Sequence, residues 1–401
     1  MAQSNWPSNR PDWKTLYAES DKAAGIEITE DFEPFTQRND VFNRAFWDER
    51  VSSKKTLEFF KSYRVGFKPR KGAGFSRKDL ALRNASWSVS DLFSNRSNEE
   101  GKREGFQSLL EVDSPVAREQ VEIEDEADFT KEVKAAAKLF GADLVGVTDL
   151  DERWHYRTRV DVRDFSEAES DLPNGMSRVI VMAHAMDFDL VKTYPSALAG
   201  AATGAEYSHE AAIVTQVVTF LRQLGFQAHG SMNDTALVIP YAVKAGLGEY
   251  ARNQMVITEE FGPRVRFSKI FTNAPLKLDQ PKRPGVQKFC DICTKCADAC
   301  PVKALPYGPP TAEPVDQSSI KGVRKWTADC VKCFGFWAAM ASDCAICMRV
   351  CPFNRPYDGW KDRLFLKVAF SRFRKLALLW DNKSKRADRQ KPEKWWQKGK
   401  A

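Results

Sequence analysis

The placing of the cysteines constrains this chain more than any other feature. All nine fall between residues 290 and 351 of a 401-residue sequence. Four are spaced C-x2-C-x2-C-x3-C ahead of Pro301: Cys290, Cys293, Cys296 and Cys300. Three more repeat the last part of that run ahead of Pro352: Cys344, Cys347 and Cys351. Thiols grouped this closely converge on a shared partner, so the folding of this stretch depends on what they bind.

The spacing is typical of bacterial two-cluster ferredoxins, whose thiolates hold [4Fe–4S] cubanes and whose fourth cysteine in each run ligates the other cluster. The first cubane is therefore predicted to be held by Cys290, Cys293, Cys296 and Cys351. The second is predicted to be held by Cys300, Cys344, Cys347 and one cysteine upstream. Ten residues separate Cys333 from Cys344 and thirteen separate Cys330 from it; both remain candidates, and Cys333 is preferred.

Zinc and disulfides are weaker interpretations of the same cysteines. Structural zinc sites favour pairs of cysteines separated by longer loops, whereas these runs are longer and end in proline. The N-terminus, MAQSNWPSNRPDWKTL, has no secretion signal and no twin arginine, and clustered thiols in such a chain are usually metal ligands. No run of about 18 apolar residues predicts a membrane span. The expectation is a soluble cytoplasmic protein, although a form trimmed of a leader would read identically.

The chain is expected to divide into four parts. Residues 1–125 are polar and aromatic and are predicted to wrap a neighbouring domain. Residues 126–280 alternate apolar helices with buried strands, for example a strand over 177–186 and a helix over 204–224, which predicts a layered α/β core. Residues 281–355 form the cluster domain.

Residues 356–401 form a basic C-terminal tail that contains an amphipathic segment, DRLFLKVAFSRFRKLALLW. Packing of its apolar face on the protein itself is the preferred interpretation. Contact with an acidic membrane surface is the alternative. The net charge of +7 does not predict nucleic-acid binding, because the charges are not interleaved with an aromatic platform on any one element.

Nearly the whole chain resembles the reductive dehalogenases, corrinoid and iron–sulfur oxidoreductases that remove halogens from organic molecules. Besides the cysteines, the resemblance lies in QRNDVFNRAFWD, GFSRKDLALRNASW, AGLGEYARNQMVITEEFGPRVR and CFGFW, at 37–48, 74–87, 245–266 and 333–337. It implies a nitroreductase-like α/β core that holds a cobamide, beside a bacterial-ferredoxin-like domain with two [4Fe–4S] clusters. Many members carry a twin-arginine leader, and its absence here favours a cytoplasmic role.

The histidines bear on how a cobamide would be held. Proteins that supply a histidine as its lower ligand use the pattern D-x-H-x-x-G. None of the four histidines lies in that pattern: His155, His184, His209 and His229. The resemblance therefore implies a base-off cobamide without a histidine ligand from the protein.

The resemblance also implies an active-site trio. Tyr207, in GAEYSHE, resembles the family's catalytic tyrosine, which would donate the proton. Arg266 or Lys269 would supply a cation that favours the phenolate and stabilises negative charge. Asn233 would act as a polar clamp. The separations of 26 residues from Tyr207 to Asn233 and 33 from Asn233 to Arg266 look like those of the family's trio.

The expected partners are a small organohalide and an external low-potential electron donor. No G-x-G-x-x-G fingerprint for a flavin or nicotinamide is present, so a ferredoxin or flavodoxin is expected to reduce the clusters. One rival function is an epoxyqueuosine reductase, in which Asp234 would be the proton donor. That family resembles GLGW-x-GK where this chain reads GLGEYAR. A non-catalytic two-cluster electron carrier is the other rival.

Overall fold

The computed structural model describes residues 13–63, 69–99, 109–160, 164–170 and 172–398. Its centre is a four-stranded sheet with the order β2-β5-β9-β6, in which every neighbouring pair is antiparallel. The strands are β2 (Leu144–Asp149), β5 (Arg178–Ala185), β6 (Ala228–Ser231) and β9 (Val265–Thr272). The alternation of helices and strands along the chain thus gives a mixed α/β core whose sheet is antiparallel.

The two middle strands are buried along almost their whole length. β5 reads RVIVMAHA, and its run of apolar residues is covered on both faces of the sheet. In the register of β5 with β9, His184 lies opposite Arg266. The predicted strand over 177–186 is therefore confirmed.

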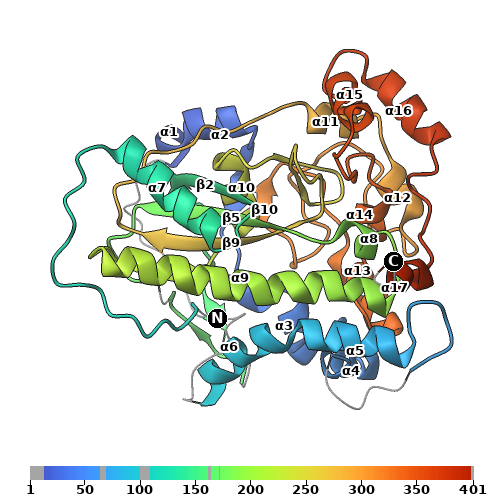
Figure 1. Cartoon of the computed structure of the whole chain (residues 1–401), viewed down its shortest axis with the longest axis horizontal. Coiled ribbons are helices and arrows are strands. Elements are labelled where there is room, and N and C mark those ends of the chain that lie inside the picture. The colour runs from blue at the N-terminus through green and yellow to red at the C-terminus, as the bar shows by residue number, and fades with distance from the viewer. Residues whose placement is uncertain (1–12, 64–68, 100–108, 161–163, 171, 399–401) are drawn as a thin grey trace.

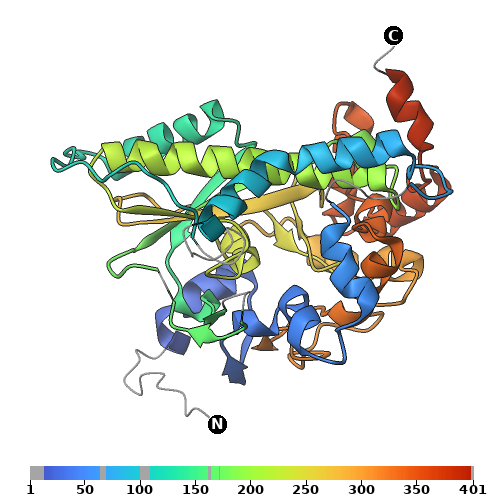
Figure 2. The same cartoon turned by 90° about the horizontal axis from the view of Figure 1, so that it is seen from below.

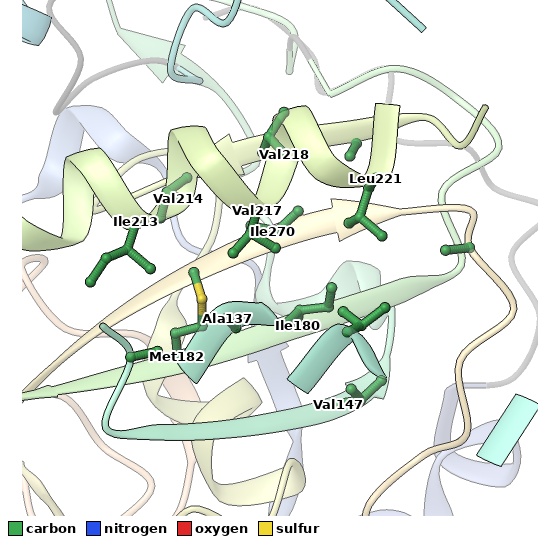
Figure 3. Close-up of a cluster of buried hydrophobic side chains, with 14 of the residues drawn as sticks. Ala137, Val147, Ile180, Met182, Ile213, Val214, Val217, Val218, Leu221 and Ile270 are labelled. Carbon is green, nitrogen blue, oxygen red and sulfur yellow. The ribbon is translucent and has the colours of Figure 1, made fainter. Parts of the chain in front are cut away.

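One face of the sheet is covered by α9 (Ala197–Gln223) and α7 (Glu126–Leu139) (Figure 1). Figure 3 shows Val214, Val217 and Leu221 of α9 directed toward Ile180 and Ile270 of the sheet. The predicted helix over 204–224 is confirmed, but it begins earlier, at Ala197, because the Ser196 side chain accepts a hydrogen bond from the Ala199 amide.

The opposite face is covered by α10 (Val238–Lys244) and by the N-terminal helix α2 (Ala18–Ala24). A buried ionic network joins them. Arg153 donates to both carboxylate oxygens of Asp21, at 2.7 and 2.9 Å, and Lys244 donates to Asp151 at 2.7 Å. The N-terminal segment is thereby fastened to the core.

Smaller elements complete the core. The helices are 3-10 helix η2 (Glu152–Trp154) and α8 (Phe188–Val191). The strands form two short hairpins: β3 (Arg159–Val160) with β4 (Glu167–Ala168), and β7 (Glu249–Tyr250) with β8 (Val256–Ile257).

The N-terminal segment runs along both the core and the cluster domain (Figure 2). Its remaining elements are α1 (Trp13–Leu16), β1 (Ile28–Glu33), 3-10 helix η1 (Gln37–Asn39), α3 (Val41–Trp47), α4 (Lys54–Lys61), α5 (Arg77–Ser86) and α6 (Ser88–Glu99). α5 lies against α9 at Gly204, where a Cβ atom would clash with Ser86 and Trp87. β1 pairs with β10, which belongs to the cluster domain.

The cluster domain is made of short helices around the cysteines: α11 (Val286–Cys290), α12 (Lys295–Ala299), β10 (Lys321–Val323), α13 (Cys330–Met340) and α14 (Ile346–Val350). A helical hairpin, α15 (Trp360–Ala369) and α16 (Arg374–Lys383), packs on it, and α17 (Pro392–Lys398) follows (Figure 1). No helix in the described ranges has the length and apolarity needed to cross a membrane.

Candidate functional site

Three side chains from three different elements meet at Tyr207. Asn233, in the turn after β6, donates from its amide nitrogen to the Tyr207 hydroxyl over 2.6 Å. Arg266, near the start of β9, donates to the side-chain oxygen Oδ1 of Asn233 over 3.3 Å. The guanidinium carbon of Arg266 lies 3.4 Å from the centroid of the Tyr207 ring. The structure thus brings the sequence-predicted trio into mutual contact.

The phenol of Tyr207 is held from its other side by an aromatic ring. Trp87, at the end of α5, stacks on it with ring centroids 4.6 Å apart and planes 29° apart. Tyr63 in turn contacts Trp87, with ring centroids 5.2 Å apart. Tyr207 is half-buried, whereas Asn233 is exposed, so the hydroxyl lies at an accessible edge of this packed group.

Burial raises the pKa of the Tyr207 phenol above its ordinary value, and the nearby Arg266 cation opposes that rise without overcoming it. Arg266 thus acts in the direction expected of a cation beside the phenol, but burial is the larger effect. The phenol keeps its proton at neutral pH, which is the state a proton donor requires.

Glu210 lies one helical turn beyond Tyr207 on α9 and is fully buried. Its Oε2 atom is 3.6 Å from Nε of Arg266. Within the described part of the chain, neither carboxylate oxygen of Glu210 has a hydrogen-bond partner. Burial raises the pKa of Glu210 to about 7, although Arg266 opposes the rise. This carboxyl group therefore changes charge near neutral pH, directly behind the Arg266–Tyr207 pair.

Lys269 does not take the position expected of it beside the phenol. It is fully buried, and its Nζ atom donates to the Met232 carbonyl over 2.9 Å. Burial lowers the pKa of Lys269 to about 8, against the opposing effect of Asp234 and Glu210. Of the two candidate cations, it is Arg266 that contacts Tyr207, while Lys269 faces the buried carboxyl groups.

Asp234 is also directed inward. It is fully buried and accepts hydrogen bonds from the Met232 amide at 2.9 Å and from the Thr235 hydroxyl at 2.6 Å. The following helix, α10, has Leu237 at its N-cap position and no side-chain cap, so Asp234 stabilises the turn that presents Asn233 and not the helix end.

Four cysteines line one pocket in the cluster domain. Its walls include Arg252, Phe289 and Phe353, and the cysteines are Cys290, Cys293, Cys296 and Cys351. Arg252 donates to the Cys290 carbonyl at 2.8 and 3.2 Å. These are the four residues predicted to hold the first cubane.

A second group of thiols lies beside the first. Burial is the main cause that raises the pKa of Cys347 well above its ordinary value, and the neighbouring thiols contribute: Cys344, Cys333, Cys296 and Cys300. Burial likewise raises the pKa of Cys333, and the neighbouring thiols of Cys344, Cys330 and Cys300 add to that rise. Cys330 instead points toward the Ala328 carbonyl, with its sulfur 3.7 Å from that oxygen.

The second thiol group and the Tyr207 site share a structural connection. Asp343, the residue before Cys344, accepts a hydrogen bond of 2.6 Å from Tyr194 and one of 3.0 Å from Thr203 on α9. Tyr63 donates to the same carboxylate over 3.5 Å and packs against Trp87. One carboxylate therefore ties the loop that carries Cys344 to the aromatic stack over Tyr207.

No three His, Cys, Asp or Glu side chains in the described ranges form a group suited to a single metal ion. The two thiol groups instead have the ligand number and spacing of [4Fe–4S] sites. The fold and these groups define a two-cluster iron–sulfur protein built on a mixed α/β core.

The comparisons with known proteins agree with this class. Residues 160–276 match the family model for a reductive dehalogenase subunit, and residues 289–354 match a 4Fe-4S double cluster binding domain. The chain is 35% identical over 275 residues to the tetrachloroethene reductive dehalogenase of Dehalobacter restrictus (strain DSM 9455 / PER-K23), covering 59% of this chain and 50% of that protein. Against the enzyme of Sulfurospirillum multivorans, it is 33% identical over 316 residues, covering 71% and 63%.

The chain is thus similar to reductive dehalogenases in both its core and its cluster domain. It spans about half to two thirds of the length of these curated relatives. The solved structure of the catabolic reductive dehalogenase NpRdhA shares the fold, with a TM-score of 0.70 and 20% identity, over 95% of this chain and 53% of that one. Epoxyqueuosine reductases match shorter stretches of the sequence.

The sequence analysis missed Glu210 and Trp87. Glu210 lies three residues after Tyr207, and residues three apart on a helix share a face, so that spacing was a usable signal. Trp87 ends the stretch GFSRKDLALRNASW, but its contact with Tyr207 depends on how α5 crosses α9, which the sequence does not display.

Proposed function

We propose that this chain removes halide from a small organohalide, using two [4Fe–4S] clusters and a base-off cobamide. The observation that carries the proposal is the contact of Tyr207 with Asn233 and Arg266, connected through Asp343 to a domain with two thiol groups. The two curated relatives compared above are named tetrachloroethene reductive dehalogenases, and these names support reductive dehalogenation as the reaction class.

The residues present fit two cubanes. Each cubane needs four thiolates, and the two groups supply eight cysteines, with Cys333 as the eighth ligand and Cys330 left over. Cys300 and Cys351 are exchanged between the runs, as the two-cluster pattern requires. The backbone amide of Ala304 also donates to the Cys300 sulfur over 3.3 Å, and hydrogen bonds of this kind raise cluster potentials.

The residues at Tyr207 fit a cobamide that takes no ligand from the protein. The buried histidine His184 lies within the sheet, where its Nε2 atom shares a hydrogen bond of 2.9 Å with the Ser268 hydroxyl. The accessible edge of Tyr207 and the exposed Asn233 leave one side of the trio open to a large planar group. When bound, the cobamide would supply the reduced cobalt that accepts the halogen.

The side chains of the trio divide the remaining work. Tyr207 holds a proton at its hydroxyl and donates it to the carbon that loses the halogen. Arg266 lies against the ring and stabilises the phenolate that this transfer leaves behind. Asn233 positions the hydroxyl, because its amide is fixed between Tyr207 and Arg266.

An external low-potential carrier supplies two electrons for each halide released. A ferredoxin or flavodoxin fits this role, because the reduction of a cubane proceeds one electron at a time.

Epoxyqueuosine reduction is the less favoured alternative. That assignment would use Asp234 as the proton donor, but Asp234 is fully buried and its carboxylate is occupied by Met232 and Thr235. A pure electron carrier would give no reason for the Tyr207 contacts.

Reconstitution with iron, sulfide and cobamide provides the test. We expect about eight irons and one cobalt per chain, in accordance with two cubanes and one corrinoid. We also expect turnover of a halophenol or a chloroethene with titanium(III) citrate, and none of an epoxyqueuosine nucleoside. A protein with eight irons that retains no cobalt would overturn the proposal in favour of the electron carrier.

A further inference from the structure

The helical hairpin α15–α16 carries a face that the protein does not cover. Large apolar side chains are exposed there, with Trp360 the most accessible at 69%; the set is Trp360, Leu364, Phe373, Leu376, Leu379 and Trp380. Cations are exposed beside them: Lys361, Arg363, Lys367, Arg372, Lys375 and Lys383. We call these twelve residues the hairpin face.

The cations of the hairpin face are not neutralised by the protein. None of the six forms an ion pair with any described residue. The two acidic side chains of the hairpin are already engaged, since Asp362 pairs with Arg355 and Asp381 pairs with Arg355, Arg386 and Lys295. The face therefore combines unburied apolar area with uncompensated positive charge, and exposed apolar patches of this kind mark interaction sites.

The first thiol pocket lies beneath this face. The exposed ring of Trp380 contacts buried Phe365, with centroids 6.0 Å apart. Phe365 contacts Phe289 at 6.2 Å and Phe353 at 6.1 Å. Phe289 and Phe353 both line the pocket that is formed by Cys290, Cys293, Cys296 and Cys351. A continuous row of ring contacts thus runs from the surface to the first cluster position.

A salt bridge also fixes the hairpin to the segment that carries Cys293 and Cys296. Lys295, which lies between Cys293 and Cys296, pairs with Asp381 of α16. The hairpin face is thereby held in one position relative to the cysteines that surround the first cluster. This arrangement suits a surface at which electrons enter.

We propose that the hairpin face docks an acidic one-electron carrier protein, which reduces the first cluster from there. This inference rests on the proposed function in one respect: the four cysteines of the first thiol pocket must hold a [4Fe–4S] cluster. In each encounter the carrier loses one electron and the [4Fe–4S] cluster gains it, going from the 2+ to the 1+ state, with no bond made or broken. Two encounters supply the two electrons for one halide.

Charge and position favour this partner over other occupants. Opposite charge on the two partners steers their encounter and fixes its register. A lipid surface would also attract the cations, but it has no electron to pass along the row of rings. A second copy of the chain would place cations against cations in a symmetric contact.

The test measures binding and cluster reduction separately. A reduced, acidic two-cluster bacterial ferredoxin serves as the probe, and the reconstituted full chain is the receptor. The variant Lys361→Glu/Arg363→Glu/Lys367→Glu reverses three exposed charges on α15. The matched control, Arg118→Glu/Lys131→Glu/Lys138→Glu, makes the same charge change at exposed positions on or before α7, on another part of the molecule (Figure 1).

We expect the α15 variant to bind ferredoxin about tenfold or more weakly at low salt, and its cluster absorbance to bleach correspondingly more slowly. The control should stay within about twofold of the unchanged protein, since its charges lie outside the contact. High salt should remove most of the difference. Titanium(III) citrate should bleach the clusters of all three proteins equally.

Equal ferredoxin binding by the α15 variant and the control would overturn the proposal. A second result would also overturn it. In that result the unchanged protein binds phosphatidylglycerol vesicles or a second copy of the chain, and the α15 variant loses this binding but still binds ferredoxin normally. Binding is measured without turnover, so a chain that binds ferredoxin normally but dehalogenates nothing would refute the proposed function and leave the docking surface standing.

Discussion

Glu210 and Arg266 lie 3.6 Å apart, carboxylate Oε2 to guanidinium Nε, on the side of Arg266 that faces away from solvent. The same guanidinium lies 3.4 Å from the Tyr207 ring centroid. The charge of Glu210 therefore decides how much of the Arg266 charge is left for the phenol. When Glu210 is protonated, it no longer offsets the positive charge of Arg266, and Arg266 then stabilises a developing phenolate more strongly.

Replacement of Tyr207 by Phe removes the proposed proton donor and leaves the ring in place. We expect turnover to fall by roughly 10²- to 10⁴-fold, the usual contribution of a positioned acid. Iron content should not change, because no thiol is altered, and cobalt content should not change, because the proposed cobamide takes no ligand from the protein. The exposed Tyr307 provides the control, and Tyr307→Phe should retain full turnover. A Tyr207→Phe protein with normal cofactors and normal rates would remove the tyrosine from the mechanism.

Replacement of Glu210 by Gln should flatten the dependence of stability on pH. The folded-state pKa of Glu210 is about 7, above the ordinary value of 4.5, so between these values the folded state holds a proton that the unfolded state releases. The contribution of Glu210 to the stability of the folded protein is therefore greatest below pH 4.5, and it is lost as the pH rises through about 7. The loss amounts to about 3 kcal/mol in the unfolding free energy.

Denaturant unfolding of the two proteins from about pH 4.5 to 8 measures this difference. Arg266, Glu206 and Lys269 also face Glu210, and they are the same in both proteins. The exposed Glu259 is a suitable control, because Glu259→Gln should leave the pH dependence unaltered. Parallel curves for the unchanged protein and Glu210→Gln would contradict the expectation.

Single replacements of Cys330 and Cys333 by Ser should separate the two candidate ligands. Cys333 faces Cys344 and Cys300, so Cys333→Ser should lower the iron content after reconstitution from about eight to about four per chain. Cys330 points toward the Ala328 carbonyl, so Cys330→Ser should keep full iron. The two variants differ only by one helical turn of α13. The reverse result would exchange their roles.

Replacement of Gly204 by Ala should disturb the packing over Tyr207. The added methyl group would clash with Ser86 and Trp87, and overpacking of this kind costs about 1 to 3 kcal/mol in the free energy of unfolding. Gly335 in α13 is the matched control, because nothing lies within 4 Å of a Cβ atom there. Gly335→Ala should stabilise its helix by up to about 1 kcal/mol. Thermal unfolding and tryptophan fluorescence measure both effects.

The sequence was most informative where chemistry dictates spacing. Thiolates that share a cubane must be close in sequence, so the two thiol groups were predictable from the cysteines alone. Tyr207, Asn233 and Arg266 are far apart in sequence, and only the family resemblance brought them together. Arg266 and Lys269 were both candidates for the cation, but three residues along a strand put two side chains on opposite faces, so only one of them can lie beside the phenol.

Tertiary packing accounts for the fold features that were less predictable. Residues 255–261, MVITEEF, contain the apolar and β-branched residues typical of a strand, yet β8 contains only Val256 and Ile257. The following turn is closed by Thr258, which exchanges backbone hydrogen bonds of 3.0 Å with Gly262. No repeating pattern of apolar residues predicts that turn. The long helix α9, in contrast, was predicted by apolar residues at helical spacing.

The pairing of β1 with β10 sets the order in which the molecule can be completed. Ile28 is the partner of Val323, so the first strand waits for nearly three hundred further residues to be synthesised before its hydrogen bonds can form. Closure between such distant segments is slow. β1 and β10 make up a two-stranded sheet, so the backbone hydrogen bonds of the strand in the N-terminal segment and of the strand in the cluster domain depend on each other.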